Sequence, residues 1–173
     1  MFNLLSKTDF YSLRDSPLPF LASPAHKGNK TIGDFVHAIA AVYPHFSARR
    51  ESVFLIFSEN IYAFMVVFFT ALLAKKKVCL LNTGKYAYLK DLFTDDTVFV
   101  SDTAESQLNI VQLLDDATHQ DSTDCTILQG LTISASADIH FYTSGSTGKP
   151  KIIEKRFSHL EREVQELFSC FGE

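Results

Sequence analysis

Residues Phe141 to Lys151 read FYTSGSTGKPK, a short apolar run followed by small hydroxylated residues, glycines and lysines. Gly145 and Gly148 allow backbone angles that are closed to other residues, so the main chain can approach a ligand closely. The hydroxyls of this stretch can donate hydrogen bonds to anionic oxygens, and Lys149 supplies a mobile positive charge. Successive backbone N–H groups in a glycine-rich turn form a concavity that binds anions. The stretch therefore predicts a phosphate-binding loop.

This loop differs from the loop of P-loop nucleotidases, which requires a glycine, four further residues and then Gly-Lys-Ser or Gly-Lys-Thr. Counting back from Gly148, the position of the first glycine holds Thr143, and Lys149 is followed by Pro150 instead of a magnesium-binding hydroxyl. Pro150 also disfavours helix at Lys149, and residues 151–155 favour an extended chain. We therefore expect the loop to join two strands.

The stretch from Tyr142 to Lys151, YTSGSTGKPK, resembles the phosphate-binding signature of the AMP-forming adenylating enzymes. This superfamily includes acyl-CoA synthetases, aryl-CoA ligases, luciferases and the adenylation domains of peptide synthetases. Residues 52–82 are similar to the early strand, helix and strand of the family, and Ser158-His159-Leu160 stands where a Thr-His pair often precedes a helix. The alternative, an ordinary surface loop rich in serine and glycine, is disfavoured by the unbroken run of matching positions.

The resemblance implies a reaction, in which a carboxylic acid is activated by ATP to an acyl-adenylate and then passed to a thiol of CoA or an acyl carrier protein. It implies ATP and Mg²⁺ as cofactors. It assigns the binding of the ATP phosphates to loop residues Thr143, Ser144, Gly145, Ser146, Thr147, Gly148 and Lys149. No catalytic residue and no intrinsic metal site are expected in this part of the family fold.

The sequence lacks later motifs of the family, namely the aromatic-Gly-x-Thr-Glu motif, the ribose-binding aspartate and the C-terminal domain with its catalytic lysine. We therefore interpret the chain as an N-terminal fragment of an adenylating enzyme that is inactive by itself. Ile152 stands where many members have glycine, which leaves the acid open. Two alternatives remain, a stand-alone phosphate- or nucleotide-binding module and an inactive interaction protein that self-associates through an exposed apolar face.

Composition indicates a globular protein that can bury one sizeable core, because 46% of its 173 residues are hydrophobic and 21% are charged. A net charge of -4 gives no electrostatic case for binding nucleic acid. Cys79, Cys125 and Cys170 lack metal-type spacing, which indicates reduced thiols. The most apolar segment, residues 61–74, is shorter than the ~20 residues that a membrane span needs. We expect a cytoplasmic protein without a membrane span.

Hydrophobic periodicity predicts an α/β fold with a mostly parallel sheet flanked by helices, and the resemblance identifies it as a partial N-terminal adenylation domain. Residues 1–30, which contain Pro17, Pro19 and Pro24, are expected to form an irregular lead-in before a domain at 31–173. The expected strands are 52–57, 77–81, 98–100, 125–128 and 138–143. The expected helices are 31–43, which Pro44 should end, and 61–74, 87–93, 108–114 and 158–171.

The sequence also predicts roles for individual side chains in capping and packing. Thr31 with Asp34 and Ser158 with Glu161 have the spacing of helix capping boxes. His140 is expected to pack beside the loop instead of acting as an acid or base. The carboxylate pairs Asp95-Asp96 and Asp115-Asp116 are expected to serve as caps and solubilising charge, and no serine or cysteine is marked as a nucleophile.

Overall fold

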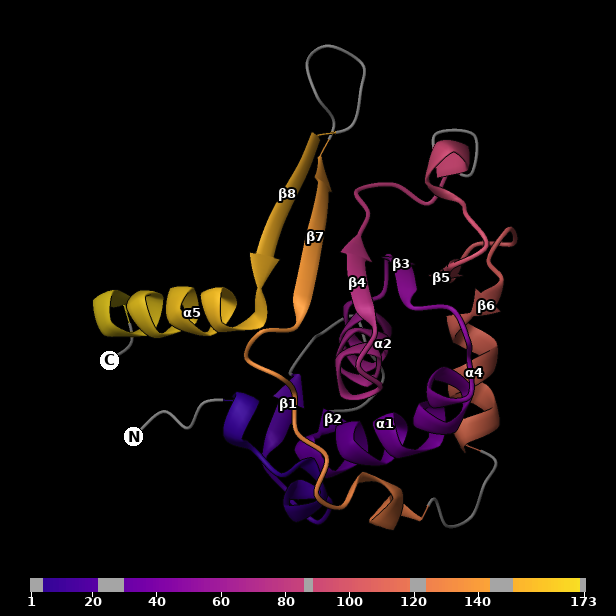
Figure 1. Cartoon of the computed structure of the whole chain (residues 1–173). Coiled ribbons are helices and arrows are strands. Elements are labelled where there is room, and N and C mark those ends of the chain that lie inside the picture. Colours follow the sequence, from indigo (N-terminus) through magenta and orange to yellow (C-terminus); the bar gives the residue numbers. More distant parts are fainter. Residues whose placement is uncertain (1–4, 22–29, 86–88, 119–123, 144–150, 172–173) are drawn as a thin grey trace.

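The centre of the protein is a six-stranded sheet with strand order β6-β5-β3-β4-β7-β8 (Figure 1). The computed structural model describes residues 5–21, 30–85, 89–118, 124–143 and 151–171. The strands of the sheet are β3 (Val53–Phe57), β4 (Lys77–Leu80), β5 (Thr97–Ser101), β6 (Leu108–Asn109), β7 (Asp138–Thr143) and β8 (Lys151–Arg156). All neighbouring strands run parallel except β7 and β8, which confirms the expected mostly parallel sheet.

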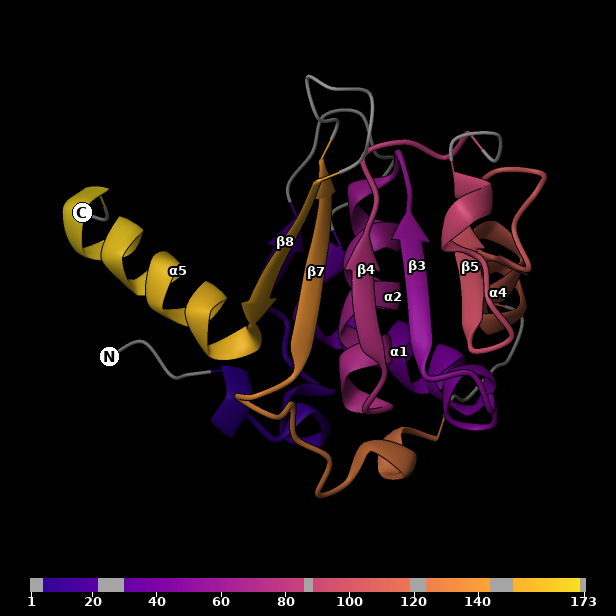
Figure 2. The same ribbon diagram turned by 45° about the horizontal axis from the view of Figure 1, so that its top comes forward.

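Helices cover one face of this sheet, and a further helix extends away from its edge (Figures 1 and 2). The covering helices are α1 (Ile32–Ser47), α2 (Ile61–Leu73) and α4 (Ile110–Thr118), and the extending helix is α5 (Phe157–Phe171). The remaining elements are the 3₁₀ helices η1 (Leu5–Lys7), η2 (Phe10–Leu13), η3 (Lys90–Leu92) and η4 (Cys125–Leu128), with the short antiparallel pair β1 (Pro19–Leu21) and β2 (Lys30–Thr31). No helix of the described residues is long and apolar enough to cross a membrane.

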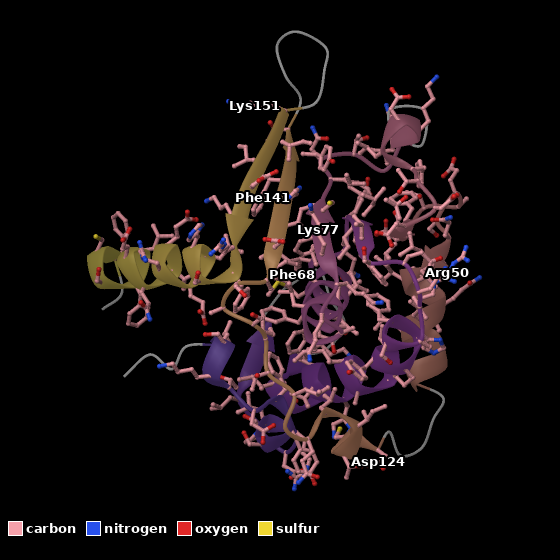
Figure 3. All side chains as sticks on the ribbon, viewed as in Figure 1. Arg50, Phe68, Lys77, Asp124, Phe141 and Lys151 are labelled. Atoms are coloured by element: carbon pink, nitrogen blue, oxygen red, sulfur yellow. The ribbon has the colours of Figure 1, made fainter. Side chains whose placement is uncertain are left out.

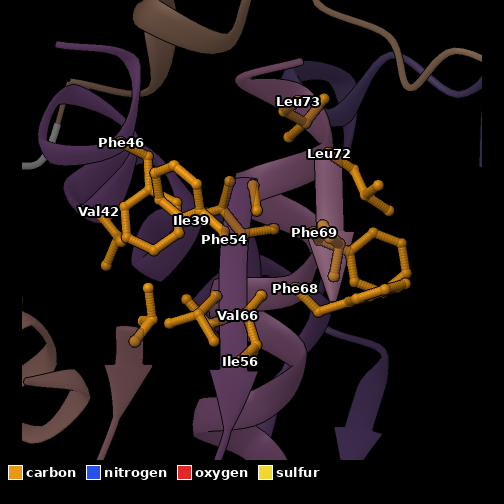
Figure 4. Close-up of a cluster of buried hydrophobic side chains, with 14 of the residues drawn as sticks. Ile39, Val42, Phe46, Phe54, Ile56, Val66, Phe68, Phe69, Leu72 and Leu73 are labelled. Carbon is orange, nitrogen blue, oxygen red and sulfur yellow. The ribbon is translucent and has the colours of Figure 1, made fainter. Parts of the chain in front are cut away.

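The core lies on both faces of the central strands, as expected for parallel strands with near-continuous apolar sequence. On the helical face, Phe54 and Ile56 of β3 pack among side chains of α1 and α2 (Figure 4). On the other face, Leu55 and Phe99 are buried beneath residues 89–93. The strand, helix and strand expected from residues 52–81 are confirmed, with β3 and β4 in parallel register.

Helix α1 begins as predicted and ends later than predicted. The capping box is present, since the Thr31 hydroxyl accepts from the Asp34 N–H and the Asp34 carboxylate accepts from the Thr31 N–H. Pro44 was expected to end this helix, but the helix continues to Ser47 with Pro44 inside it. The proline removes one backbone donor near the helix end, and burial of Phe46 against Phe54, with ring centroids 4.9 Å apart, favours the extra turn.

Two further expectations were wrong. Residues 125–128 form the 3₁₀ helix η4 instead of a strand, because the Asp124 carboxylate caps it by accepting from the Thr126 N–H at 2.9 Å. In α5, Glu161 makes no capping box with Ser158. The Ser158 N–H donates to the Ala135 carbonyl, and the Glu161 carboxylate is buried where it accepts from the N–H and hydroxyl of Ser6.

Smaller departures concern residues 87–113. Leu108 and Asn109 pair with β5 as strand β6 before helix α4 begins at Ile110, although a helix was expected from residue 108. The short helix expected at 87–93 is represented by the 3₁₀ helix η3, and residues 86–88 lie outside the described residues.

The packing of α2 against the sheet generates a first prediction. Leu72 is 1% exposed in the main core, so Leu72→Ala should lower the free energy of unfolding by about 2–5 kcal/mol through lost burial and an unfilled cavity. Leu18 is 60% exposed and is the matched control, for which alanine should cost less than about 0.5 kcal/mol. Urea denaturation with an unchanged m-value measures both, and equal losses would contradict this assignment of the core.

The capping box of α1 generates a pH prediction. Hydrogen bonds from the Thr31 backbone and hydroxyl lower the pKa of Asp34, so its charged form stabilises the fold above the ordinary aspartate pKa of about 4. This stabilisation should be lost as the pH falls through the lowered pKa of the folded state. The stability advantage of the wild type over Asp34→Asn should therefore be largest near neutrality and shrink below pH 4. Thermal unfolding across pH measures it, with exposed Glu105→Gln as the control.

Candidate functional site

Strands β7 and β8 bring the two ends of the predicted phosphate-binding stretch together. β7 pairs antiparallel with β8 along its whole length, from Asp138 opposite Arg156 to Thr143 opposite Lys151. The Thr143 hydroxyl donates a hydrogen bond to the Lys151 carbonyl, with 3.3 Å between the oxygens. The expectation that the loop joins two strands is therefore confirmed, because it leaves β7 and enters β8 at directly paired residues.

Of the predicted phosphate ligands, Thr143 lies within the described residues, where it is half-buried at the end of β7. Ser144, Gly145, Ser146, Thr147, Gly148 and Lys149 lie outside the described residues. The place of the loop is nevertheless fixed at its base. Lys151 lies at the end of the molecule opposite Asp124 (Figure 3).

Four strands end at this same edge of the sheet. β3, β4, β5 and β7 run parallel to one another, so their carboxyl ends, and the base of the loop, lie together. In open α/β sheets the crevice outside the carboxyl ends of the strands is the usual site of ligand binding. The base of the predicted phosphate loop, Thr143 and Lys151, thus lies where this architecture places ligands.

Two of these strand ends are joined by a polar clamp. The Asp102 carboxylate, one residue beyond β5, accepts from the Ser58 hydroxyl at 2.7 Å and from the Glu59 N–H at 3.0 Å. Asn60 then caps α2, since its side-chain oxygen accepts from the Ala63 N–H. The clamp therefore fixes the turn between β3 and α2 against the end of β5.

The exit from β4 packs tightly over the neighbouring strand ends. A Cβ atom at Gly84 would lie 2.6 Å from the ring of Phe57 and 2.8 Å from the methyl group of Thr103. Glycine is therefore required for this close approach. Together with Asp102, this packing holds the carboxyl edge as a firm surface next to the loop.

The two faces of β7 have different environments, because successive side chains of a strand point to opposite faces. Ile139 and Phe141 pack in the main core, while Tyr142 packs with the cluster on the other face. His140 is 8% exposed, and burial lowers its pKa, aided by the charge of Lys77. A buried neutral imidazole agrees with the packing role expected for His140.

The cysteine thiols, which could in principle be nucleophiles, are not activated in this structure. The Cys125 thiol is 3.3 Å from Nδ1 of His37, but burial raises the pKa of Cys125, so the thiol is not an activated nucleophile. Burial likewise raises the pKa of Cys79 to about 11.

Asp96 accepts from the backbone N–H and hydroxyl of Ser52 at the amino ends of β3 and β5, which is the capping role expected for it. Among the described side chains no group of three or more His, Cys, Asp or Glu could hold a metal ion.

Neither the clamp nor the close packing at Gly84 is predicted by the sequence. A signal for the clamp was present, because Ser58 and Asp102 each follow a predicted strand, and the carboxyl ends of parallel strands share one edge. The pairing could not be derived without the strand order. β5 lies next to β3 although β4 separates them in sequence.

Comparison with solved structures supports the architecture. No family model matches the sequence, and no curated protein matches it in sequence. The structure matches o-succinylbenzoate CoA synthetase (MenE) of Bacillus subtilis in complex with the acyl-adenylate intermediate OSB-AMP, with a TM-score of 0.68, 17% identity, and coverage of 95% of this chain and 46% of that chain. It also matches the N-terminal subdomain of Klebsiella oxytoca NpsA, with a TM-score of 0.65, 19% identity, and coverage of 92% and 45%. The chain has the fold of the N-terminal subdomain of adenylating enzymes.

The match is to part of these enzymes. A MenE structure in complex with AMP is matched with a TM-score of 0.67 and 18% identity, over 95% of this chain and 37% of that chain. The chain spans less than half the length of each of the three structures. The comparison therefore concerns the first part of the fold, which contains the sheet and the base of the loop.

The clamp generates a prediction. Asp102→Ala should cost about 1–3 kcal/mol of unfolding free energy, because it removes the charged acceptor of the hydrogen bonds from the Glu59 N–H and the Ser58 hydroxyl. Asp102→Asn keeps one acceptor oxygen and should cost less. Urea denaturation measures the loss, and hydrogen exchange of the Glu59 amide locates it. Exposed Asp95→Ala is the control, and an equal loss there would contradict a specific clamp.

Proposed function

We propose that this chain supplies the phosphate-binding part of an enzyme that activates a carboxylic acid with ATP. The observation that carries the proposal is the coincidence of two independent features. The signature Tyr142 to Lys151 bridges β7 and β8 at the carboxyl edge, and the fold containing that edge is shared with enzymes solved in complex with AMP and an acyl-adenylate. A surface loop that is merely rich in serine and glycine could occur in any fold, so its occurrence at this position of this fold favours the binding role.

In the proposed reaction, a carboxylate oxygen attacks the α-phosphorus of ATP, the bond to the β-phosphate oxygen breaks, and pyrophosphate leaves. Residues 143–149 form the loop that holds the β- and γ-phosphates, through backbone N–H groups, the hydroxyls of Ser144, Ser146 and Thr147, and the Lys149 ammonium. Such donors stabilise the negative charge that moves onto pyrophosphate, and they need little reorganisation when they are already oriented. Within this chain the contribution to catalysis is therefore positioning and charge stabilisation.

The base of the loop supports this role. Because Thr143 and Lys151 are paired and linked by a hydrogen bond, the loop is closed at one point and its entropy cost of ordering around phosphate is reduced. The Thr143 hydroxyl uses its proton in that bond, so its role is to close the loop, while Ser144, Ser146, Thr147 and Lys149 are the proposed donors to phosphate.

The partners follow from the same proposal. Mg²⁺ would enter with ATP and be held mainly by phosphate oxygens. The acyl group passes from the adenylate to a thiol of CoA or an acyl carrier protein. The proposed domain occupies residues 31–173, and the proposed location is the cytoplasm, where these partners occur.

The first test is nucleotide binding by this chain. Isothermal titration with MgATP and with pyrophosphate should show saturable binding, and Lys149→Ala should weaken it about tenfold or more, since a charge-assisted contact to phosphate is lost. Gly148→Val should abolish binding, because a branched side chain blocks the approach of the backbone.

Exposed Lys90→Ala in η3 is the matched control for loss of one positive charge, and its affinity should equal that of the wild type. Equal losses at Lys90 and Lys149 would indicate nonspecific electrostatics and contradict the assigned loop. Absence of any binding to both ligands by the folded wild type would contradict the proposal for this chain.

A further inference from the structure

The hairpin of β7 and β8 is joined to the rest of the sheet through the pairing of β7 with β4 (Figures 1 and 2). β7 pairs with β8 at six positions and with β4 at three. The three pairs with β4 are Val78 with Ile139, Cys79 with His140, and Leu80 with Phe141. His140 therefore lies in the middle of the junction between the sheet and the hairpin that carries both ends of the phosphate signature.

The His140 side chain lies on the face of the sheet that α1 and α2 leave free. Ile139 and Phe141, its neighbours in β7, pack in the main core, so the alternation of the strand places His140 on the opposite face with Tyr142. The side chain of His140 is 11% exposed. A histidine is the kind of side chain that changes its charge between about pH 5 and 8, so the junction contains a titratable group that is withdrawn from water.

Charges of opposite sign lie on the two sides of this imidazole. On the β8 side, the Glu154 carboxylate is 3.8 Å from Nε2 of His140 and its side chain is 75% exposed. On the β4 side, Lys77 stands two residues before the partner of His140, on the same face of the sheet. Burial lowers the pKa of His140, and the charge of Lys77 lowers it further. A proton on the ring would therefore be repelled from β4 and attracted toward β8.

The other groups on this face leave that asymmetry in place. Asp138 raises the pKa of His140, but Arg156 lies directly opposite Asp138 on β8. Cys79 and Tyr142 stay uncharged near neutrality, because burial raises the pKa of the thiol and of the phenol. Protonation of His140 therefore adds a positive charge on a face where its neighbour on β4 is already a cation.

We propose that His140 makes the junction between the hairpin and the sheet sensitive to pH. A proton gained by its imidazole in mildly acid solution loosens the pairing of β7 with β4 and thereby weakens anion binding by the loop that the hairpin carries. The loosening is independent of any ligand. Its effect on anion binding rests on the phosphate-binding role proposed above.

The range of pH follows from the direction of the pKa shift. In an open junction the ring is in water and gains its proton near the ordinary histidine pKa of about 6.5, whereas in the closed junction it does so at a lower pH. The closed junction is therefore fully stabilised above about pH 6.5 and loses stability as the pH falls toward the lowered pKa. Within that interval each pH unit should favour the open form by up to about tenfold.

Hydrogen exchange of the full chain at about pH 7.5 and about pH 5.5 tests the loosening, with His140→Gln as the variant that cannot gain the proton. Protection factors of β7 amides should fall up to about tenfold more in the wild type than in the variant, while those of β5 amides should be equal in both. Exposed His45→Gln is the matched control and should behave as the wild type. Equal falls in the wild type and His140→Gln, or equal falls in β7 and β5, would overturn the proposal.

A second variant keeps the histidine and changes its neighbour. Lys77→Gln should raise the pKa of His140, followed by NMR of the ring protons, and should reduce the dependence of β7 protection on pH. Exposed Lys75→Gln is the control for loss of one positive charge and should leave both unchanged. A wild-type His140 that titrates at or above the ordinary histidine pKa would contradict the proposal, even if His140→Gln failed to fold.

Calorimetric titration with pyrophosphate at the same two pH values tests the link to the loop. The loss of affinity on acidification should be larger in the wild type than in His140→Gln, and the ligand's own protonation cancels because it is the same for both proteins. Equal losses would contradict the link. Absence of binding at both pH values would contradict the function proposed for the loop, whereas hydrogen exchange decides the loosening of the junction by itself.

Discussion

Burial of β3 between two parallel neighbours is the constraint on which the rest of the structure depends. β3 pairs with β4 on one side and β5 on the other, and its inner residues are fully shielded on both faces. Parallel strands need crossover segments, and these segments cover the faces that the strands cannot expose. Helices α1 and α2 cover one face, and residues 89–93 cover the other.

The parallel arrangement of the strands also decides which edge of the sheet is available for binding a ligand. Because β3, β4, β5 and β7 are parallel to one another, their carboxyl ends form one edge, and the chain leaves each of these strands there. Polar groups fix both ends of the β3 and β5 pair: Asp96 binds Ser52 at the amino end, and Asp102 binds Ser58 at the carboxyl end. The loop after β7 therefore starts from a rigid edge, although the loop itself has a sequence suited to wrapping an anion.

Apolar side chains of β8 and α5 are exposed instead of packing in the main core. Antiparallel β8 ends the sheet, its residues are largely exposed, and it directs α5 away from the body. Ile152 and Ile153 of β8 remain 45% and 40% exposed, one on each face of the edge strand. Exposed edges of this kind favour association, which distinguishes this end of the protein from the clamped carboxyl edge of β3 and β5.

The sequence by itself determined the class of fold, the alternation of strands and helices from residue 52 to residue 82, the cap of α1 and the two strands around the phosphate signature. These features depend on local patterns, namely apolar periodicity, capping spacing and the effect of Pro150 on its neighbours. Only the tertiary structure decided that α1 continues through Pro44, that residues 125–128 form a 3₁₀ helix and that Glu161 binds Ser6. Strand order and the Ser58 and Asp102 clamp also required it, because such contacts join residues far apart in the chain, and local sequence carries no record of which distant groups will meet.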